Sequence, residues 1–154
     1  MEALYTDLGA VPAGELVGKT TIALRSPRLE AEEAELNGPK VVGSKGASNK
    51  KAVGATSHGH SIRFEDCNVS KVRSLTVRTA VGSAVVGSKM EVHLDSPTGP
   101  LAATVEVPNT GGWDNWVETK APFNAATGRH DLFIVLVNPG KGGLMNVDWI
   151  EFGF

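Results

Sequence analysis

Short runs in which apolar and polar residues alternate, separated by clusters of turn-forming residues, are the feature that most constrains the fold of this chain. Such runs cover residues 71–80, 89–95, 101–107 and 146–154. Alternation with a period of two is typical of β-strands that bury one face. The intervening segments include DSPTGP, PNTGG, NAATG and NPGKGG, whose Gly, Pro, Asn and Asp residues favour tight turns. Closely spaced strands of this kind predict an all-β protein, an antiparallel β-sandwich.

The alternation also predicts which side chains face the core. In the first three runs we expect these to be Val72, Leu75, Val77, Thr79, Met90, Val92, Leu94, Leu101, Ala103, Val105 and Val107. A further run, HDLFIVLV at residues 130–137, is apolar on both faces and predicts a central strand that is buried on both sides. One face would carry Leu132, Ile134 and Leu136, and the other Phe133, Val135 and Val137.

Two segments near the N-terminus are open to two interpretations each. The composition of LEAEEAEL, residues 29–36, favours a helix, but Ser-Pro before it and Asn-Gly-Pro after it leave room for only a few residues. A strand that runs into a short turn is the alternative. Within residues 1–27, the segment AGELVGKTTIAL is either an added strand or the tail of a preceding domain.

The composition excludes several classes of function. A chain of 154 residues fits one domain, and its formal net charge of -2 gives no reason to expect nucleic acid or a membrane as partner. Cys67 is the only cysteine, so neither an intrachain disulfide nor a cysteine metal cluster can form. No apolar run is long enough to span a bilayer, and the N-terminal MEALYTDLGA lacks the basic start and apolar block of a signal peptide.

Catalytic motifs are also missing from the sequence. Hydrolysis of a glycosidic bond needs two facing carboxylates, and neither Asp114 with Glu118 nor Asp95 with Glu106 forms a recognisable pair. The sequence contains no Ser-His-Asp arrangement, phosphate-binding loop or dinucleotide motif. We therefore expect a protein without enzymatic activity of its own.

Four segments, in this order and spacing, resemble carbohydrate-binding module family 6 over about residues 28–154. They are RLEAEEAEL, VHLDSPTGPLAATVEVPNTGGWDNWVE, ATGRHDLFIVLV and LMNVDWIEF. The resemblance implies a β-jelly-roll that is appended to a glycoside hydrolase and binds a plant, algal or fungal polysaccharide. It favours the strand interpretation of residues 29–36 and leaves residues 1–27 as an N-terminal extension. We expect a monomer, secreted as part of a larger extracellular enzyme.

Trp113 is the first candidate for sugar binding. It follows Gly111 and Gly112 in a turn, where an indole can stand at a loop rim and stack its flat face on a pyranose ring. The resemblance implies that this position forms one wall of the ligand cleft. The alternative is that Trp113 caps the end of the core. Trp116 and Trp149 lie in strand patterns, and we expect them to pack in the core.

Asn146 is the second candidate, because a side-chain amide both donates and accepts hydrogen bonds, as vicinal sugar hydroxyls require. The resemblance implies ligand contact at this position, whereas an asparagine that satisfies loop backbone groups is the alternative.

A second aromatic wall is also implied, but the chain has Ala55 where that ring is expected and Ser61 where a tryptophan is common. His58 or His60 would supply a flat partner or a hydrogen bond; otherwise the cleft is one-sided. These histidines also suggest zinc, but a zinc site needs three or four ligands, so solvated or hydrogen-bonded imidazoles are expected. A structural module with a decayed sugar cleft is the alternative function.

Three carboxylates predict a structural calcium site. Glu30 and Glu32 alternate, so in an extended chain both side chains point to one side, and Asp148 would join them where the first and last strands meet. Calcium prefers six to eight oxygen ligands in flexible geometry. The resemblance implies a calcium ion at these positions, away from the sugar cleft. The alternative is a solvated acidic face, because Glu33 and Glu35 continue the run.

Overall fold

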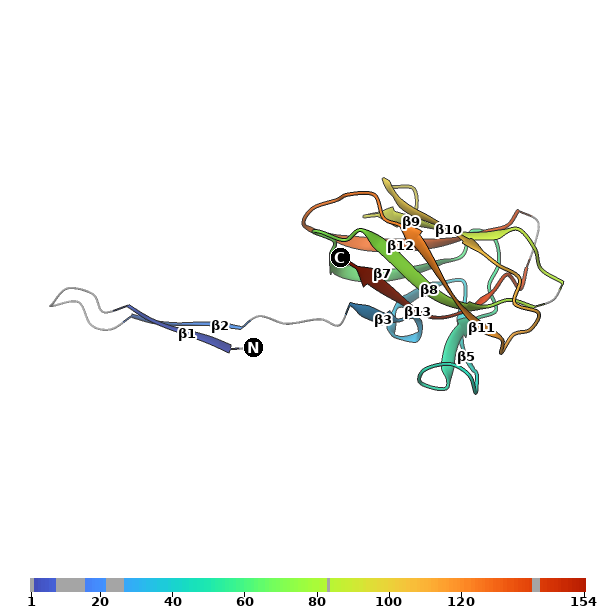
Figure 1. Cartoon of the computed structure of the whole chain (residues 1–154), viewed down its shortest axis with the longest axis horizontal. Coiled ribbons are helices and arrows are strands. Elements are labelled where there is room, and N and C mark those ends of the chain that lie inside the picture. The colour runs from blue at the N-terminus through green and yellow to red at the C-terminus, as the bar shows by residue number, and fades with distance from the viewer. Residues whose placement is uncertain (1, 8–15, 22–26, 83, 140–141) are drawn as a thin grey trace.

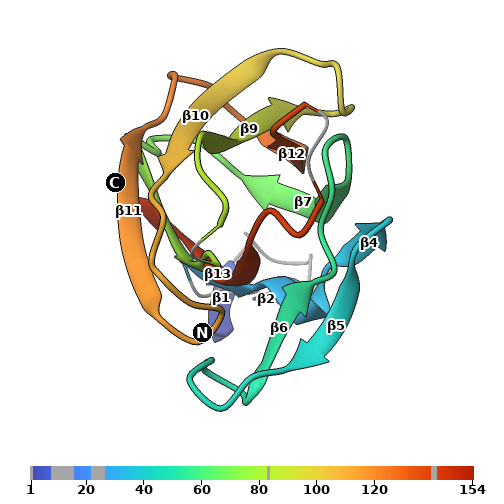
Figure 2. The same ribbon diagram turned by 90° about the vertical axis from the view of Figure 1, so that its right-hand side faces the viewer.

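The alternating runs fold into two antiparallel sheets that face each other, as the computed structural model of residues 2–7, 16–21, 27–82, 84–139 and 142–154 shows (Figures 1 and 2). One sheet has the strand order β10-β9-β12-β7-β4, and the other has the order β11-β8-β13-β6-β5, with β3 also paired to β13. The strands are β3 (Arg28–Glu30), β4 (Glu35–Asn37), β5 (Lys40–Gly43), β6 (Lys51–Gly54), β7 (Ser61–Asn68), β8 (Ser74–Ala80), β9 (Ser88–Leu94), β10 (Leu101–Val107), β11 (Trp116–Pro122), β12 (Arg129–Val137) and β13 (Asn146–Gly153). The predicted all-β antiparallel sandwich is confirmed.

The core lies between the two sheets and is made by the inward faces that the alternation predicted. Ten of the eleven residues predicted to face it from β8, β9, β10 and the residues just before β8 are buried. Leu101 is the exception, at 46% exposed. The register between β10 and β9 shifts between Leu101 and Ala103, and this irregularity turns Leu101 outward while Ala102 and Ala103 are both buried.

β12 is central in its sheet, as predicted, but it is not fully buried on both faces. Leu132, Ile134 and Leu136 are completely buried. Phe133, Val135 and Val137 are only half-buried, because their face of the sheet is turned away from the partner sheet. The apolar character of that second face was therefore a poor guide to its burial.

The segment at residues 29–36 forms no α-helix. It consists of β3, a single 3-10 turn η1 (Ala31–Glu33) and β4, so the strand-and-turn interpretation is correct. η1 moves the chain from one sheet to the other, since β3 pairs with β13 and β4 pairs with β7. Among the residues that the structure describes, no helix is long and apolar enough to cross a membrane.

The two strand-borne tryptophans differ in their surroundings. Trp149 is 2% exposed, as expected, although the guanidinium of Arg28 covers its ring at 3.8 Å from the centroid. The prediction that Trp116 packs in the core was wrong, because it begins the edge strand β11 and is half-buried outside the core cluster.

Upstream of the sandwich, β1 (Glu2–Asp7) pairs antiparallel with β2 (Leu16–Thr21) as a separate two-stranded sheet. Figure 1 draws this hairpin apart from the sandwich. The predicted added strand within residues 13–24 corresponds to β2, while the rest of that segment lies outside the described residues.

Candidate functional site

Trp113 is displayed by the loop between β10 and β11, and its side chain is 43% exposed. The indole rests on the backbone of Gly82 and lies beside Gly143. A Cβ atom at position 82 would lie 2.6 Å from Cε2 of the ring, and one at position 143 would lie 3.7 Å from Cη2. Real Cβ atoms essentially never come within 3.0 Å of another such heavy atom, so a side chain at position 82 would displace the ring. Glycine is therefore required beneath Trp113 for close approach.

The loop that carries Trp113 is held by hydrogen bonds to the residues that follow β8. The amide of Val81 donates to Oγ1 of Thr110 at 2.7 Å, and the amide of Gly112 donates to the carbonyl of Val81 at 3.0 Å. The side-chain amide of Asn109 donates to the carbonyl of Gly82 at 3.0 Å. These anchors fix the loop backbone, so Trp113 is presented by a constrained turn.

Asn146, the first residue of β13, lies next to Trp113. Its Nδ2 donates to the main-chain carbonyl of Trp113 at 3.1 Å. Its Oδ1 faces Gly54, where a Cβ atom would lie 2.8 Å from that oxygen and 2.8 Å from Cγ2 of Val42. Trp113 and Asn146 are thus neighbours on the surface of the sandwich, and the residues beside them, Gly54 and Gly82, have no side chains. We call this surface the Trp113 site. The Asn146 amide retains a second N–H with which it can donate to a ligand.

The second wall that the resemblance implies is not aromatic. Ala55 is exposed, with φ of 53°, so its methyl group takes the place expected for a ring. His60 lies against Gly38, and its Nδ1 accepts from the amide of Ser57 at 3.2 Å. His58 accepts from the amide of Asn138 at 3.3 Å through its Nδ1.

Both imidazole groups therefore accept from backbone amides that lie outside the loop that carries Trp113. Ser61, the other position at which the resemblance implies an aromatic residue, is 3% exposed at the start of β7.

The predicted carboxylates do converge. Ligand atoms of Glu30, Glu32 and Asp148 all lie within 4.8 Å of one another. Glu30 ends β3 opposite Trp149 of β13, whereas Glu32 lies in η1. The sequence suggested that Glu30 and Glu32 come together because they alternate in an extended chain. In the structure, the 3-10 turn η1 brings Glu32 back beside Glu30 instead. We call these three residues the carboxylate cluster.

Polar groups around the cluster satisfy some of its carboxylate oxygen atoms and leave others without a hydrogen-bond partner among the described residues. Asp148 is completely buried, accepts from the amide and hydroxyl of Ser48 at 3.0 Å each, and pairs with the guanidinium of Arg78. Oε1 of Glu32 accepts from Asn49 Nδ2 at 2.9 Å. In the described part of the chain, Oε2 of Glu30 and Oε2 of Glu32 are buried without a hydrogen-bond partner.

Electrostatics within the cluster favour a bound cation. Desolvation raises the pKa of Glu30, and the neighbouring negative charges of Glu32 and Asp148 raise it further. Arg78 pairs with Asp148, and the three carboxylates together outnumber this one cation, so negative charge remains in the cluster. Buried, unpaired carboxylate oxygens with this residual charge fit a hard divalent cation such as calcium.

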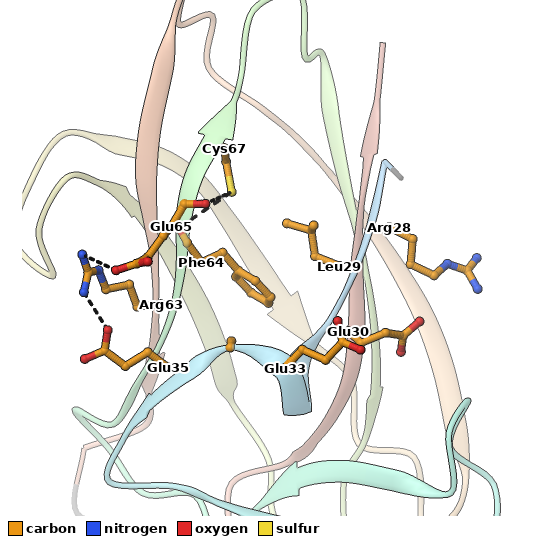
Figure 3. Close-up of a pocket in the computed structure, with 10 residues that line it drawn as sticks. Arg28, Leu29, Glu30, Glu33, Glu35, Arg63, Phe64, Glu65 and Cys67 are labelled. Carbon is orange, nitrogen blue, oxygen red and sulfur yellow. Dashed lines mark hydrogen bonds and ion pairs between the residues drawn. The ribbon is translucent and has the colours of Figure 1, made fainter. Parts of the chain in front are cut away.

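Beside the cluster, a hollow of about 560 Å³ opens between β3, η1 and β7 (Figure 3). Leu29, Phe64 and Cys67 contribute apolar surface to it. On its rim, Arg63 binds Glu35 at 2.6 Å and Glu65 at 3.0 Å. Arg63, Glu35 and Glu65 are thus paired with one another on this rim. Cys67 lies near the end of β7, whereas the loop that runs beside Gly142 precedes the start of β7, so the hollow lies away from that loop.

The two-sheet sandwich and the comparisons with known proteins place the chain in the class of carbohydrate-binding modules. The chain belongs to carbohydrate-binding module family 6, whose match covers residues 30–153. It is a binding module and not a catalytic domain.

Relatives and solved structures agree with this assignment. The arabinoxylan arabinofuranohydrolase of Bacillus subtilis (strain 168) is 33% identical in an alignment of 146 positions that covers 91% of this chain and 28% of that enzyme. A family 6 module of Clostridium cellulolyticum in complex with xylose has a TM-score of 0.77 at 27% identity, covering 84% of this chain and 100% of the other. A β-1,3-glucan-binding family 6 module of Bacillus halodurans has a TM-score of 0.76 at 30% identity, covering 86% of this chain and 100% of the other. The chain spans less than a third of the length of the curated enzymes that it matches.

Sequence reasoning missed the residues that support the site. Gly54 and Gly82 follow apolar residues at strand ends, so the sequence indicates that they lie in turns. It does not indicate that Gly54 contacts Asn146 or that Gly82 contacts Trp113. Thr56 was also missed. Its completely buried hydroxyl donates to the carbonyl of Met145 at 2.8 Å and accepts from two backbone amides, which ties the end of β6 to the start of β13.

Proposed function

We propose that this module binds a β-linked plant polysaccharide, with xylan and arabinoxylan as the first candidates, at the Trp113 site. The observation that carries the proposal is the 43% exposed indole of Trp113, fixed on glycine backbone with Asn146 beside it. Stacking on the indole would supply most of the affinity, and the amide would orient the sugar hydroxyls. The choice of polymer is supported by the relative named for arabinoxylan and by the xylose complex of the Clostridium cellulolyticum module.

We further propose that the module acts outside the cell as a monomeric part of a glycoside hydrolase. Its relatives are enzymes several times longer than this chain. A module that binds the polymer raises the local concentration of the attached catalytic domain on that polymer.

Affinity electrophoresis tests the sugar site. Soluble arabinoxylan, linear xylan, barley β-glucan and laminarin are cast into native gels with wild type, Trp113→Ala and Phe154→Ala. Phe154 is 71% exposed at the end of the chain and provides a matched exposed aromatic residue outside the site. Loss of one stacking ring weakens binding by roughly tenfold to a hundredfold, so Trp113→Ala should migrate freely and Phe154→Ala should be retarded like wild type.

The rival function is a structural module of a glycoside hydrolase with a decayed cleft. It is favoured by the methyl group of Ala55 and by the backbone contacts of His58 and His60. Free migration of wild type in every gel would support this function and reject sugar binding. Retardation that Trp113→Ala leaves intact would move the binding site to another surface.

We propose calcium as the ligand of the carboxylate cluster. A cation that binds only the folded state raises the free energy of unfolding by about 2.7 kcal/mol at a hundredfold excess over its Kd. For a domain of this size we therefore expect saturating calcium to raise Tm by roughly 5–10 °C over EDTA. Glu30→Gln should abolish most of this rise, and an identical Tm in calcium and EDTA would reject the ion.

A further inference from the structure

Residues 44–50, the loop between β5 and β6, contact both the carboxylate cluster and the loop that displays Trp113. On the cluster side, the amide and hydroxyl of Ser48 donate to Asp148 at 3.0 Å each. The adjacent Asn49 donates to Glu32 at 2.9 Å. Two consecutive residues of this loop are therefore anchored on carboxylates that would hold the cation.

On the other side, the same loop is bonded to the residue next to Trp113. The hydroxyl of Ser44 donates to Oδ1 of Asp114 at 2.6 Å, and Ser44 is 6% exposed. Gly46 lies against the ring of Trp116, where a Cβ atom would lie 2.7 Å from Cδ1. The β5–β6 loop thus contacts Asp114 and Trp116, two residues of the short segment that begins at Trp113.

Backbone hydrogen bonds within the loop join its two ends and its middle. The amide of Ser44 donates to the carbonyl of Lys50 at 3.0 Å, and the amide of Lys50 donates to the carbonyl of Ala47 at 3.1 Å. Ala47, between Ser44 and Ser48, is buried. These contacts leave little slack chain between Ser48 and Ser44, so we expect a displacement of one to reach the other.

Without a cation, the three carboxylates repel one another across buried space. A divalent cation on the unpaired Oε2 atoms of Glu30 and Glu32 would remove this repulsion. It would leave Oε1 of Glu32 and the Ser48 contacts of Asp148 available to hold the loop.

We propose that a divalent cation at the carboxylate cluster and a saccharide at the Trp113 site bind with positive coupling, carried by residues 44–50 through the Ser44–Asp114 hydrogen bond. This inference rests on the proposed function. Ser44 and Asp114 act as positioning residues, since they hold the backbone that presents Trp113. Coupling between binding sites is reciprocal, so the saccharide must strengthen cation binding by the same factor.

Titration calorimetry with soluble arabinoxylan, in excess calcium chloride or in EDTA, measures the coupling. Wild type should bind about fivefold more tightly in calcium, at the lower end of typical coupling. In Ser44→Ala and Asp114→Ala the affinity should no longer depend on calcium, while Tm still rises on addition of calcium. Ser44→Thr and Asp114→Asn keep a donor and an acceptor at these positions and should retain the coupling.

Ser70→Ala is the matched control, because the hydroxyl of Ser70 accepts one hydrogen bond, from the amide of Gly128, in a different loop. It should behave as wild type. Equal wild-type affinity in calcium and EDTA, with Tm raised by calcium, would overturn the coupling alone, as would a full calcium response in both Ser44→Ala and Asp114→Ala. Failure of wild type to bind arabinoxylan or any other polymer would overturn the proposed sugar function as well, and an unchanged Tm would reject the cation together with the coupling.

Discussion

At one end of the sandwich, Trp113 rests on the bare backbone of glycine residues. At the other end, where β7 finishes and β12 begins, arginine and carboxylate side chains bind one another. There, Arg129 contacts Asp66 at 2.6 and 2.8 Å, and Arg63 contacts Asp131 at 2.7 Å. The same strands run between both ends, since Arg129 pairs with Asn68 and Val135 with Ser61. The two ends therefore differ in what they can bind. Paired charges satisfy each other's hydrogen-bonding groups, whereas glycine backbone leaves one face of the indole exposed for a ligand.

The substitution with the largest expected effect removes the glycine that supports Trp113. Gly82→Ala places a methyl group 2.6 Å from the current position of Trp113 Cε2, so the indole must move. We expect affinity for the polysaccharide to fall by about tenfold or more, as when a stacking ring is lost, with little change in Tm. Calorimetric titration and thermal unfolding measure the two effects.

Gly43→Ala is the matched control for this change, because a Cβ atom at position 43 has nothing within 4 Å. Its affinity should equal that of wild type. Wild-type affinity in Gly82→Ala would show that the ring does not depend on its glycine support.

A second change acts at the charged end. Asp131→Ala removes the acceptor of the Asp66 amide at 3.0 Å and the partner of Arg63. Because these groups are partly exposed, we expect Tm to fall by only a few degrees and affinity for the polysaccharide to stay unchanged.

Asp131→Asn keeps an acceptor for the Asp66 amide but not the charge, so its Tm should lie between those of wild type and Asp131→Ala. A loss of sugar affinity in either variant would contradict the separation of the two ends.

The smallest expected effect is a dependence of stability on pH at the charged end. Both ring nitrogens of His130 face acceptors, with Nδ1 at 2.8 Å from Asp95 and Nε2 at 3.0 Å from the carbonyl of Thr127. Only the doubly protonated ring can donate to both. The Asp95 carboxylate, and then the Thr127 carbonyl, raise the pKa of His130 above its ordinary value of 6.5. The resulting stabilisation is complete below pH 6.5 and is lost as pH rises through the raised pKa.

Urea unfolding of wild type and His130→Gln over this pH range measures the contribution. The wild-type midpoint should decrease toward alkaline pH relative to that of the variant, by a small amount because Asp95 is exposed. Parallel pH profiles of the two proteins would contradict this assignment.

How far the sequence predicts this molecule depends on whether a feature is local. The inward faces of β8 and β9 followed from alternation alone, because each strand buries one face. The prediction for Leu101 was wrong because the register shift that turns it outward depends on pairing with the neighbouring strand β9. Similarly, Trp116 was misplaced because its own run of residues does not reveal that β11 lies at the edge of the sheet.

For the candidate site, the sequence identifies the chemical groups but not their support. Trp113, Asn146 and the three carboxylates were found from residue type, turn context and family resemblance. Gly54 and Gly82 were not, because their role depends on contacts with residues more than 25 positions away along the chain. The Ser44–Asp114 hydrogen bond, which joins residues 70 positions apart, gives no local signal.

The Trp113 site has a consequence for folding order. Its parts come from the ends of β6, β8 and β13 and from the loop before β11, and the hydroxyl of Thr56 closes a contact with Met145 across 89 residues. Contacts of such long sequence separation form late and slowly in β-proteins. Competence to bind sugar should therefore be gained only when the whole sandwich is assembled, so that a polysaccharide ligand reports on completed folding and not on any single hairpin.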